Sequence, residues 1–527
     1  MAVAENNNAP RDWKKRESFA SAMVQVLIVA VLLAGAVYFF QQRGARKKEI
    51  ADRMKEAKTL AMRDNPQDLD KAWEELEAIF KLDSDSKEAL ALAADIYTQR
   101  WLIHMQDGAE PKAREYLSRA EKQEARTEER YASQLLILLG EGKASEAEKL
   151  SEELRKQGAN SPKLWHALGE TLQAQGNLPL ARTAFAKATE MSWRSPRLFA
   201  SYGEAMIDQA DYRAAIDALQ KGLNVNGDHT RTQISLALAR IYREQQVKEA
   251  SDTINSVLAQ DNLTPGMRAR ALAAKAELAN FERRYDDAIA AADESLKINS
   301  KERFALFARA RALAMKKDPG AADAFKSAVT RNPSSPVLYF TGAKLLQENG
   351  NFEAAVALLD GYEKFFSAVQ VPDGEKTRTA LERDDRYWIV RGDLFKAAGK
   401  LDEALTSYDR AVTVDGVNRR QAHYARGVLY FEKKDLEKAT EDLDKVTPED
   451  GTGALPEAYE AKGRLLFAKK DFAVGAQNFA FALSGMKRQG APREKLNGLL
   501  DEVTKMLQAN GQKEMAKLWQ DEAKQYI

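Results

Sequence analysis

The sequence of 527 residues contains no cysteine. Disulfide bonds, thiolate metal sites, cysteine nucleophiles and lipidated cysteines are therefore excluded. Histidine is also scarce, and the four present are too scattered to pair at a metal-ligand spacing: His104, His166, His229 and His423. A long chain without a stray thiol favours an oxidising compartment, with chance as the alternative explanation.

The chain has almost no net charge and is poor in glycine and proline. Its 80 Lys and Arg residues balance 79 Asp and Glu residues, and a net charge of +1 argues against general nucleic-acid binding. With 29 Gly and 14 Pro residues, we expect no long disordered linkers beyond the N-terminal tail. The chain is too long for one ordinary core, whereas a repeat array escapes that limit because each unit packs only on its neighbours.

The N-terminal region contains the one long apolar run of the sequence. Residues 1–18 form a polar, basic tail, and residues 19–40, FASAMVQVLIVAVLLAGAVYFF, follow without a charge. Because about 20 apolar residues cross a bilayer, this run predicts a transmembrane helix. A cleaved signal peptide is the alternative, since Ala34-Gly35-Ala36 has the form of a cleavage site.

Basic residues flank both ends of this run, so charge alone gives no clear topology. The residues after the run include Arg43, Arg46, Lys47, Lys48, Arg53 and Lys55. A simple count of these charges places the large domain that follows in the cytoplasm, but long domains translocate largely regardless of charge. Since the chain also lacks cysteine, we expect a single-pass inner (cytoplasmic) membrane protein with a periplasmic large domain, and a cytoplasmic domain is the alternative.

Residues 162–188, PKLWHALGETLQAQGNLPLARTAFAKA, contain a pattern that recurs along most of the chain. In this copy the pattern residues are Trp165, Leu168, Gly169, Leu172, Gly176, Ala181, Phe185 and Ala188. The next copy begins 34 residues later, at Pro196, where the same offsets hold Phe199, Tyr202, Gly203, Met206, Ala210, Ala215, Leu219 and Gly222. This period, with small residues in register with aromatic ones, resembles the tetratricopeptide repeat, a helix–turn–helix unit.

The resemblance implies an all-α fold, a right-handed α-solenoid of about 12 helical hairpins after the transmembrane helix. Each hairpin needs a small residue where its second helix approaches the first. The sequence supplies Ala72, Ala113, Ala147, Ala181, Ala215, Ala250, Ala288, Ala321, Ala355, Ala404, Ala439 and Gly475. Further repeat-packing residues are Trp165, Gly169, Phe185, Gly203, Trp388, Gly392, Gly427 and Gly463. Another helical-hairpin repeat is the alternative fold.

The spacing of the repeats suggests a division of the array. Between Ala355 and Ala404 the spacing is longer than elsewhere, and Val371-Pro372-Asp373-Gly374 there is a turn signal. We therefore expect an N-terminal sub-array over 45–366, an inserted loop over 367–384, a C-terminal sub-array over 385–485 and capping helices over 486–527. The loop is either a binding element or a spacer between the sub-arrays.

No catalytic or cofactor-binding constellation is evident. Gly140-Glu141-Gly142-Lys143 resembles part of a phosphate-binding loop, but Ala144 stands where a hydroxyl residue would hold magnesium and no strand precedes it. Acidic pairs such as Asp384-Asp385 lie where helices begin, where carboxylates serve as caps. We therefore predict no enzyme activity, no cofactor, no metal and no small-molecule substrate.

The resemblance implies that the first helices of the hairpins line a concave face that binds other proteins. The polar residues expected on that face are Lys163, His166, Glu170, Arg197, Glu204, Arg386, Asp393, Lys396, Tyr424, Glu460 and Arg464. The predicted function is a membrane-tethered scaffold for a bacterial envelope assembly, such as secretion, motility, cell-wall synthesis or outer-membrane biogenesis. Two alternatives are a chaperone-like quality-control module near the translocon and a regulatory adaptor of a membrane-associated enzyme.

Overall fold

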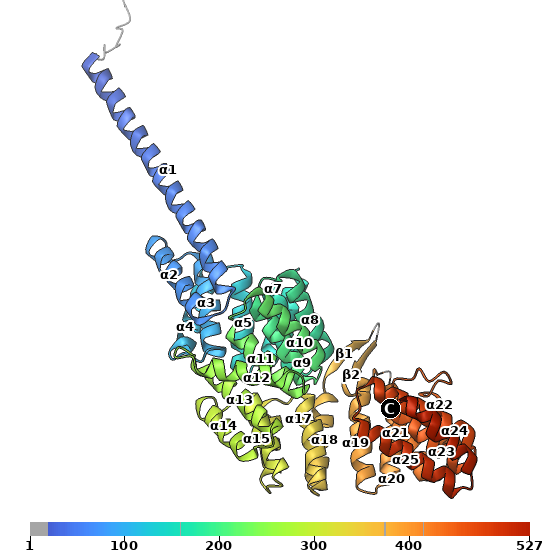
Figure 1. Cartoon of the computed structure of the whole chain (residues 1–527). Coiled ribbons are helices and arrows are strands. Elements are labelled where there is room, and N and C mark those ends of the chain that lie inside the picture. The colour runs from blue at the N-terminus through green and yellow to red at the C-terminus, as the bar shows by residue number, and fades with distance from the viewer. Residues whose placement is uncertain (1–18, 159, 374–375, 415, 527) are drawn as a thin grey trace, which may run out of the picture.

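The computed structural model describes residues 19–158, 160–373, 376–414 and 416–526. In this part the chain forms 26 α-helices, two 3₁₀ turns and one two-stranded sheet, in agreement with the predicted all-α solenoid. The basic tail predicted for residues 1–18 lies outside the described residues. Figure 1 shows α1 projecting from one end of the array and the helices from α19 onward at the other end.

Helix α1 (Phe19–Ala61) joins the apolar run to the first hairpin without a break. Its 43 residues give it a length of about 65 Å at 1.5 Å per residue. The segment Met23–Ala61 is long and apolar enough to be a candidate membrane span, and its apolar window is not buried by any other part of the protein. The last turns of α1, from Met54 onward, pack against α2. One helix therefore carries both the candidate span and the first packing face of the array.

Twelve helical hairpins follow one another among the described residues, as the positions of the small residues predict. The first pairs are α1 with α2 (Pro66–Leu82), α3 (Lys87–Leu102) with α4 (Ala109–Lys122), α5 (Glu128–Gly140) with α6 (Ala144–Lys156), and α7 (Pro162–Ala174) with α8 (Leu178–Met191). The next are α9 (Pro196–Asp208) with α10 (Tyr212–Val225), α11 (Thr230–Tyr242) with α12 (Val247–Leu258), α13 (Pro265–Phe281) with α14 (Tyr285–Ile298), and α15 (Arg303–Met315) with α16 (Ala321–Arg331). The last are α17 (Pro336–Glu348) with α18 (Phe352–Phe366), α19 (Asp385–Ala397) with α20 (Leu401–Thr413), α21 (Arg419–Glu432) with α22 (Leu436–Asp444), and α23 (Pro456–Ala468) with α24 (Phe472–Arg488).

Each hairpin has a small residue on its second helix, and several have a glycine on the first helix as well. All twelve predicted small residues lie on the second helix of a pair, and all are buried. Five glycines of first helices face the apolar or aromatic residue four positions after the small residue of the second helix: Gly169, Gly203, Gly392, Gly427 and Gly463. A Cβ added at Gly169 would lie 2.8 Å from Phe185, and one added at Gly463 would lie 2.8 Å from Phe479. These glycines are needed because a side chain there would push the two helices apart.

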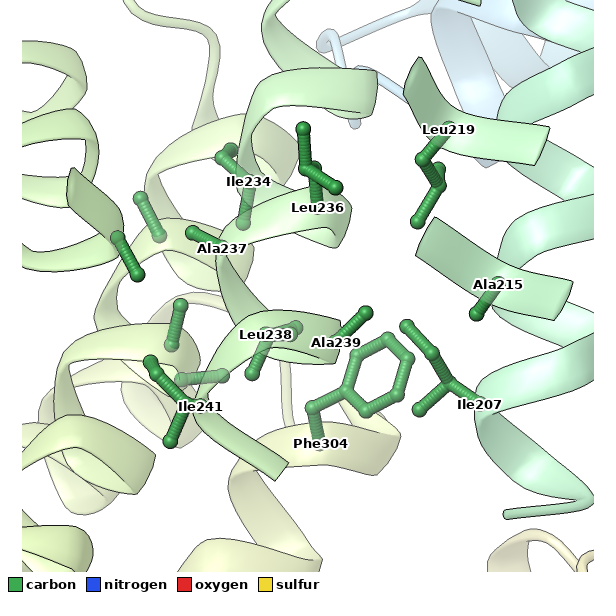
Figure 2. Close-up of a cluster of buried hydrophobic side chains, with 14 of the residues drawn as sticks. Ile207, Ala215, Leu219, Ile234, Leu236, Ala237, Leu238, Ala239, Ile241 and Phe304 are labelled. Atoms are coloured by element: carbon green, nitrogen blue, oxygen red, sulfur yellow. The ribbon is translucent and has the colours of Figure 1, made fainter. Parts of the chain in front are cut away.

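The first and second helices of the hairpins differ in burial. Nearly every residue of α9 is buried, whereas α10 buries only Ala215, Ala218, Leu219 and Gly222. The same contrast holds for α11 and α13 against α12 and α14. The first helices therefore lie inside the array and the second helices form its outer layer. Figure 2 shows the apolar core where α9, α10, α11 and α15 meet, with Leu219 and the Phe304 ring beside α11.

The array winds tightly enough that hairpins far apart in sequence contact one another. The backbone N–H of Gly266, at the start of α13, donates a hydrogen bond of 3.0 Å to the carbonyl of His104, just after α3. A Cβ at Gly266 would overlap the carbonyl oxygen of Ile103, so the two segments meet at backbone distance. Helices α9 and α17 also contact each other. The interior of the superhelix is consequently filled by its own first helices.

The predicted loop at 367–384 contains a short β-hairpin instead of irregular chain only. Strands β1 (Gln370–Asp373) and β2 (Lys376–Thr379) pair antiparallel, with Val371 opposite Arg378, and a 3₁₀ turn (Leu381–Arg383) follows. The carbonyl of Gln370 accepts a hydrogen bond from the Asn177 side chain, 193 residues earlier in the sequence. The hairpin is therefore attached to the α7–α8 turn, and the division into sub-arrays at this point stays a prediction.

Two further helices cover the last hairpin. Helices α25 (Arg493–Ala509) and α26 (Lys513–Ala523) lie where capping helices are expected, and a 3₁₀ turn (Lys524–Tyr526) follows. Leu496, Leu500 and Trp519 pack against Phe479 of α24, and the Trp519 indole N–H donates to the Leu500 carbonyl at 3.1 Å. The apolar face of α24 is thus covered instead of exposed.

Candidate functional site

The structure brings together the predicted site residues of the N-terminal half; His166, Arg197 and Glu204 are buried, and Lys163 and Glu170 are half-buried. Lys163 Nζ lies 2.6 Å from Asp95 Oδ2, and Arg197 Nη1 lies 3.2 Å from Asp95 Oδ1. The Asp95 side chain is 1% exposed. Burial alone raises the pKa of Asp95, but Lys163 and Arg197 outweigh burial and lower it to about 2. Asp95 is therefore the shared anion of two cations from α7 and α9.

Glu204 is the centre of a larger ion cluster on the inner helices. Its carboxylate accepts hydrogen bonds from Arg231 at 2.9 and 3.0 Å, from Arg270 at 2.7 Å and from Arg303 at 3.1 Å. Ser235 Oγ donates a further bond of 2.8 Å. Burial raises the pKa of Glu204, and the three guanidinium groups reverse that effect and hold it well below the ordinary value. Four inner helices are linked through this one carboxylate.

His166 and Glu170 form a separate pair one turn apart on α7. His166 Nε2 lies 2.8 Å from Ser201 Oγ and 3.5 Å from Glu170 Oε1. Burial lowers the pKa of His166. The pKa of Glu170 is raised by burial, but His166 and Arg231 lower it to about 2. With Glu204, this pair lines a cavity of about 270 Å³ that also contacts Arg197, Arg231, Arg270 and Arg303.

Asp208 lies one turn after Glu204 on α9, and its pKa is shifted in the opposite direction. Burial raises its pKa to about 6, and Arg303, whose Nη1 lies 3.1 Å away, only partly offsets that effect. Its carboxylate accepts from Gln173 Nε2 at 2.9 Å, and Ser335 at the start of α17 donates to its backbone carbonyl at 3.2 Å. Asp208 thus connects the α9 layer to a hairpin four repeats later.

The predicted site residues of the C-terminal half are more accessible and do not form one cluster. Arg386 reaches back to the carbonyl of Gln209 at 3.2 Å. Asp393 is exposed and accepts from Tyr408 Oη at 2.6 Å, and Tyr424 is half-buried. The remaining members pair within their own helix or with a later one. Lys396 pairs with Glu432 of α21 at 2.7 Å, and Arg464 pairs with Glu460 of the same helix at 2.8 Å and with Glu502 of α25 at 2.6 Å.

The predicted packing residues occupy the interfaces between helices. Gly203 faces Leu219, Gly392 faces Tyr408, and Gly427 faces Leu443. The two tryptophans are less buried than the glycines and alanines. Trp165 is half-buried, donates from its indole N–H to Asn160 at 2.7 Å and lies under Lys187 Nζ. Trp388 is half-buried too and packs edge-on against Tyr387.

Sequence reasoning missed a buried site around Asp64, in the turn after α1. His104 Nε2 lies 3.4 Å from Asp64 Oδ1, and His229 Nε2 lies 3.6 Å from Asp64 Oδ2. Burial raises the pKa of Asp64, but the two histidines hold it far below its ordinary value. Nothing in the local sequence brings these residues together. Asp95 was also missed, although a lone carboxylate in the apolar run ALALAADIY of α3 predicts a buried counter-charge.

The described residues show no arrangement suited to metal binding or to the phosphate-loop reading. No group of three or more His, Asp or Glu side chains in that part of the chain could hold a metal ion. Lys143 ends the α5–α6 turn and pairs with Glu141 at 2.7 Å instead of standing free over a phosphate site. Asp384 caps α19 by accepting from the Tyr387 backbone N–H at 3.1 Å, as expected for an acidic residue at a helix start.

A family model for the tetratricopeptide repeat matches residues 273–336 and 389–454 of the chain. These residues span α14–α16 and α20–α22, together with parts of the adjacent helices. No protein with a curated description matches the chain.

Several solved structures are similar to this chain over most of its length. The human IFIT1 dimer with PPP-AAAA is 16% identical, covers 78% of this chain and 96% of its own, and gives a TM-score of 0.44. Yeast Tom70 is 14% identical over 91% of this chain and 96% of its own, with a TM-score of 0.38. The Cut9–Hcn1 hetero-tetramer of the APC/C is 11% identical over 87% and 93%, with a TM-score of 0.37. All three TM-scores lie below 0.5, so the likeness is loose.

Proposed function

We propose that this chain, two segments of which match a family model for the tetratricopeptide repeat, is a membrane-tethered, non-catalytic scaffold that binds other proteins. The observation that supports the tether is the continuity of α1. Its apolar first half is unpacked, with Leu27 65% and Leu32 66% exposed, and its last turns are built into the first hairpin. An unpacked apolar helix of this length is stable where lipid covers it.

The accessible inner surface of the C-terminal hairpins is the proposed contact for a partner. The site residues on α7 and α9 are engaged in buried ion pairs, so a partner would have to break those pairs to reach them. Asp393, Lys396 and Tyr424 lie on α19 and α21 and remain at least partly exposed. The ion pair of Lys396 with Glu432 is partly exposed, so its exchange for a partner's charge costs little. We place the proposed protein contact on these helices.

The scaffold would act in a bacterial envelope, with its repeats on the periplasmic side of the inner membrane. A tether raises the effective concentration of a partner near the membrane without tight binding. A chain without cysteine is suited to an oxidising compartment. The exposed residues 41–49 of α1 separate the apolar run from the first hairpin by about 14 Å, which leaves room for headgroups.

Extraction of membranes with alkaline carbonate tests the tether. The full chain should stay in the pellet, and a chain that begins at residue 45 should move to the supernatant. Recovery of the full chain in the supernatant would refute the membrane tether. The replacement Leu32→Arg is a milder version of the same test, since a charge at the centre of a span costs about 3 kcal/mol of insertion free energy.

Fusion of alkaline phosphatase after residue 527 tests the side of the membrane. The enzyme folds into its active form only in an oxidising compartment, so a periplasmic repeat domain should give active fusions in intact cells. An inactive fusion, together with an active cytoplasmic reporter at the same position, would place the repeats in the cytoplasm. The scaffold proposal would survive that result, and its periplasmic location would not.

A further inference from the structure

A groove of about 1090 Å³ lies on the outer layer of the array, between α16 and α18. Both are second helices of hairpins. They run parallel because the chain reverses direction once before α17 and once after it. The α7–α8 turn and the start of β1 close the groove at the C-terminal end of α18. There Gly176 is packed against Phe365, Phe366 and Val369. The groove is therefore distinct from the inner face that carries the predicted partner-binding residues.

Small, apolar residues form much of the two walls of the groove. Ala354, Ala357 and Gly361 follow one another at helical spacing along the wall formed by α18, and Ala322 and Val329 lie on the wall formed by α16. None of these five residues is fully buried. Small residues on a helix face let another helix approach to the 8–10 Å typical of packed helices. The 15 residues of α18 correspond to a length of about 22 Å, which is four turns of helix.

An unsatisfied acceptor lies at the closed end of the groove. Asn177 is 7% exposed and lines the groove. Its Nδ2 donates to Gln370, but its Oδ1 is buried and has no hydrogen-bond partner. A buried amide oxygen without a partner destabilises the folded protein. A ligand with free N–H groups therefore suits this end of the groove.

The charged residues at the two ends of the groove differ in sign, and they favour one orientation of a bound helix. Lys364 lies near the Asn177 end, on the last turn of α18, and Asp323 lies at the opposite end, on the first turn of α16. Lys326 is midway along α16, and Glu148 of α6 also lines the groove. The first turn of an α-helix has free N–H groups and favours acidic side chains, and the last turn favours basic ones. A helix with its first turn beside Asn177 and Lys364 and its last turn beside Asp323 fits both features.

We propose that this groove binds an amphipathic α-helix of a partner protein, antiparallel to α16 and α18, with small apolar residues on its buried face and an acidic first turn. The binding follows the helix-in-groove mode, with anchors at i, i+3, i+4 and i+7. This inference rests on the proposed scaffold function and adds a second surface to it. The partner helix places the free N–H groups of its first turn beside the Asn177 side chain and pairs a first-turn carboxylate with Lys364.

Fluorescence anisotropy with two synthetic helical peptides tests the groove. Both peptides have 14 residues with Ala and Leu on one face; one has Glu in its first turn and Lys in its last turn, and the other has these charges exchanged. The full-length protein is held in lipid nanodiscs, and empty nanodiscs report binding to lipid alone. The first peptide should bind saturably and the charge-exchanged peptide about tenfold more weakly, which is a difference of 1.4 kcal/mol.

Variants locate the binding. Lys364→Glu should weaken the first peptide about three- to tenfold and improve the charge-exchanged peptide. Lys297→Glu is the matched control, because Lys297 is exposed and occupies the same position relative to Ala288 that Lys364 occupies relative to Ala355. Ala357→Leu should abolish binding by filling the groove without adding charge, and circular dichroism checks that each variant is folded.

Three results would overturn the proposal. Equal binding to the Lys364→Glu and Lys297→Glu variants would place the peptide elsewhere, and binding to empty nanodiscs alone would assign it to lipid. A wild-type dimer that Ala357→Leu converts to a monomer, without peptide binding, would show that a second copy of the chain occupies the groove. Each of these results leaves the membrane tether and the inner-face contact untouched, because carbonate extraction and inner-face crosslinking test those separately.

Discussion

Gly203 illustrates at the scale of one residue why small side chains recur in this chain. A Cβ at this position would lie 2.7 Å from Leu219 Cδ2 and would also overlap its Cγ, within a fully buried contact between α9 and α10. The same relation holds between Gly392 and Tyr408 in a later hairpin. The sequence period therefore reports a geometric requirement, namely the close approach of two helices.

Replacement of Gly203 by Ala should destabilise the protein although alanine favours helix. Overpacking in a dense core costs about 1–3 kcal/mol, more than the gain of about 0.5–1 kcal/mol in helix propensity. Urea unfolding of the full chain in detergent, followed by circular dichroism, measures the change. Gly498→Ala in α25 is the control, because a Cβ there has open space and should stabilise. Stabilisation by both variants would contradict the close-packing account.

Replacement of Glu204 by Gln tests the ion cluster of the inner helices. The substitution leaves Arg231, Arg270 and Arg303 without their shared anion, and an uncompensated buried charge costs about 3–5 kcal/mol. The urea midpoint should fall accordingly, whereas the exposed Glu190→Gln should leave it unchanged. Equal midpoints for the two variants would mean that the cluster contributes nothing to stability.

The ion pairs of Asp95 predict a pH dependence with a definite sign. The pKa of Asp95 is about 2 in the folded protein, below its ordinary 3.8, so its contribution to stability is fully present above pH 4 and is lost as the pH falls through 2. That contribution is about 2 kcal/mol. Asp95→Asn should therefore lower the urea midpoint more at pH 7 than at pH 3. A midpoint difference that grows on acidification would contradict these pairs, and the exposed Asp252→Asn serves as control.

The helices could be located from the sequence because hairpin packing is local. Ala181, Ala215 and Ala404 each mark a second helix, and the residues that surround them lie within one repeat. Contacts between distant repeats carry no such local signal. The β-hairpin at Gln370–Thr379 is attached to Asn177, and Asp64 meets His104 and His229, through the winding of the superhelix. Small rotations between repeats add up to that winding, and no single repeat encodes it.

The same reason limits what the sequence indicates about the site residues. Offsets within a repeat assign Lys163, His166 and Glu204 to first helices, and they lie on α7 and α9. They do not reveal that distant repeats meet, because that depends on the residues just after α3 contacting the start of α13, five hairpins later. The partner-binding role of these residues stays a prediction, and their ion pairs are what the structure adds.

Replacement of Gly266 by Ala tests the contact between α3 and α13. The added Cβ would overlap the carbonyl of Ile103 and weaken the backbone hydrogen bond from Gly266 to His104. The two segments should separate, so the radius of gyration from small-angle X-ray scattering should rise while the helix content stays the same. An unchanged scattering profile together with unchanged stability would show that this contact does not close the superhelix.

At the scale of the whole molecule, α1 and the solenoid form one continuous object. The helix that carries the apolar run is also the first helix of the array. A partner on the inner face of α19 and α21 would therefore be held at a fixed distance from the membrane. Figure 1 shows these helices at the end of the array opposite to α1. The scaffold account therefore requires both membrane attachment and a specific contact at that end.

Site-specific photocrosslinking in native membranes tests both requirements in one measurement. A photoreactive residue replaces Asp393, which is exposed on α19, or Lys297, which is exposed on the outer helix α14, and the membranes are washed with carbonate after irradiation. The account predicts a discrete protein adduct in the washed pellet for position 393 and none of that size for position 297. The same adducts at both positions, or the chain in the supernatant, would contradict it.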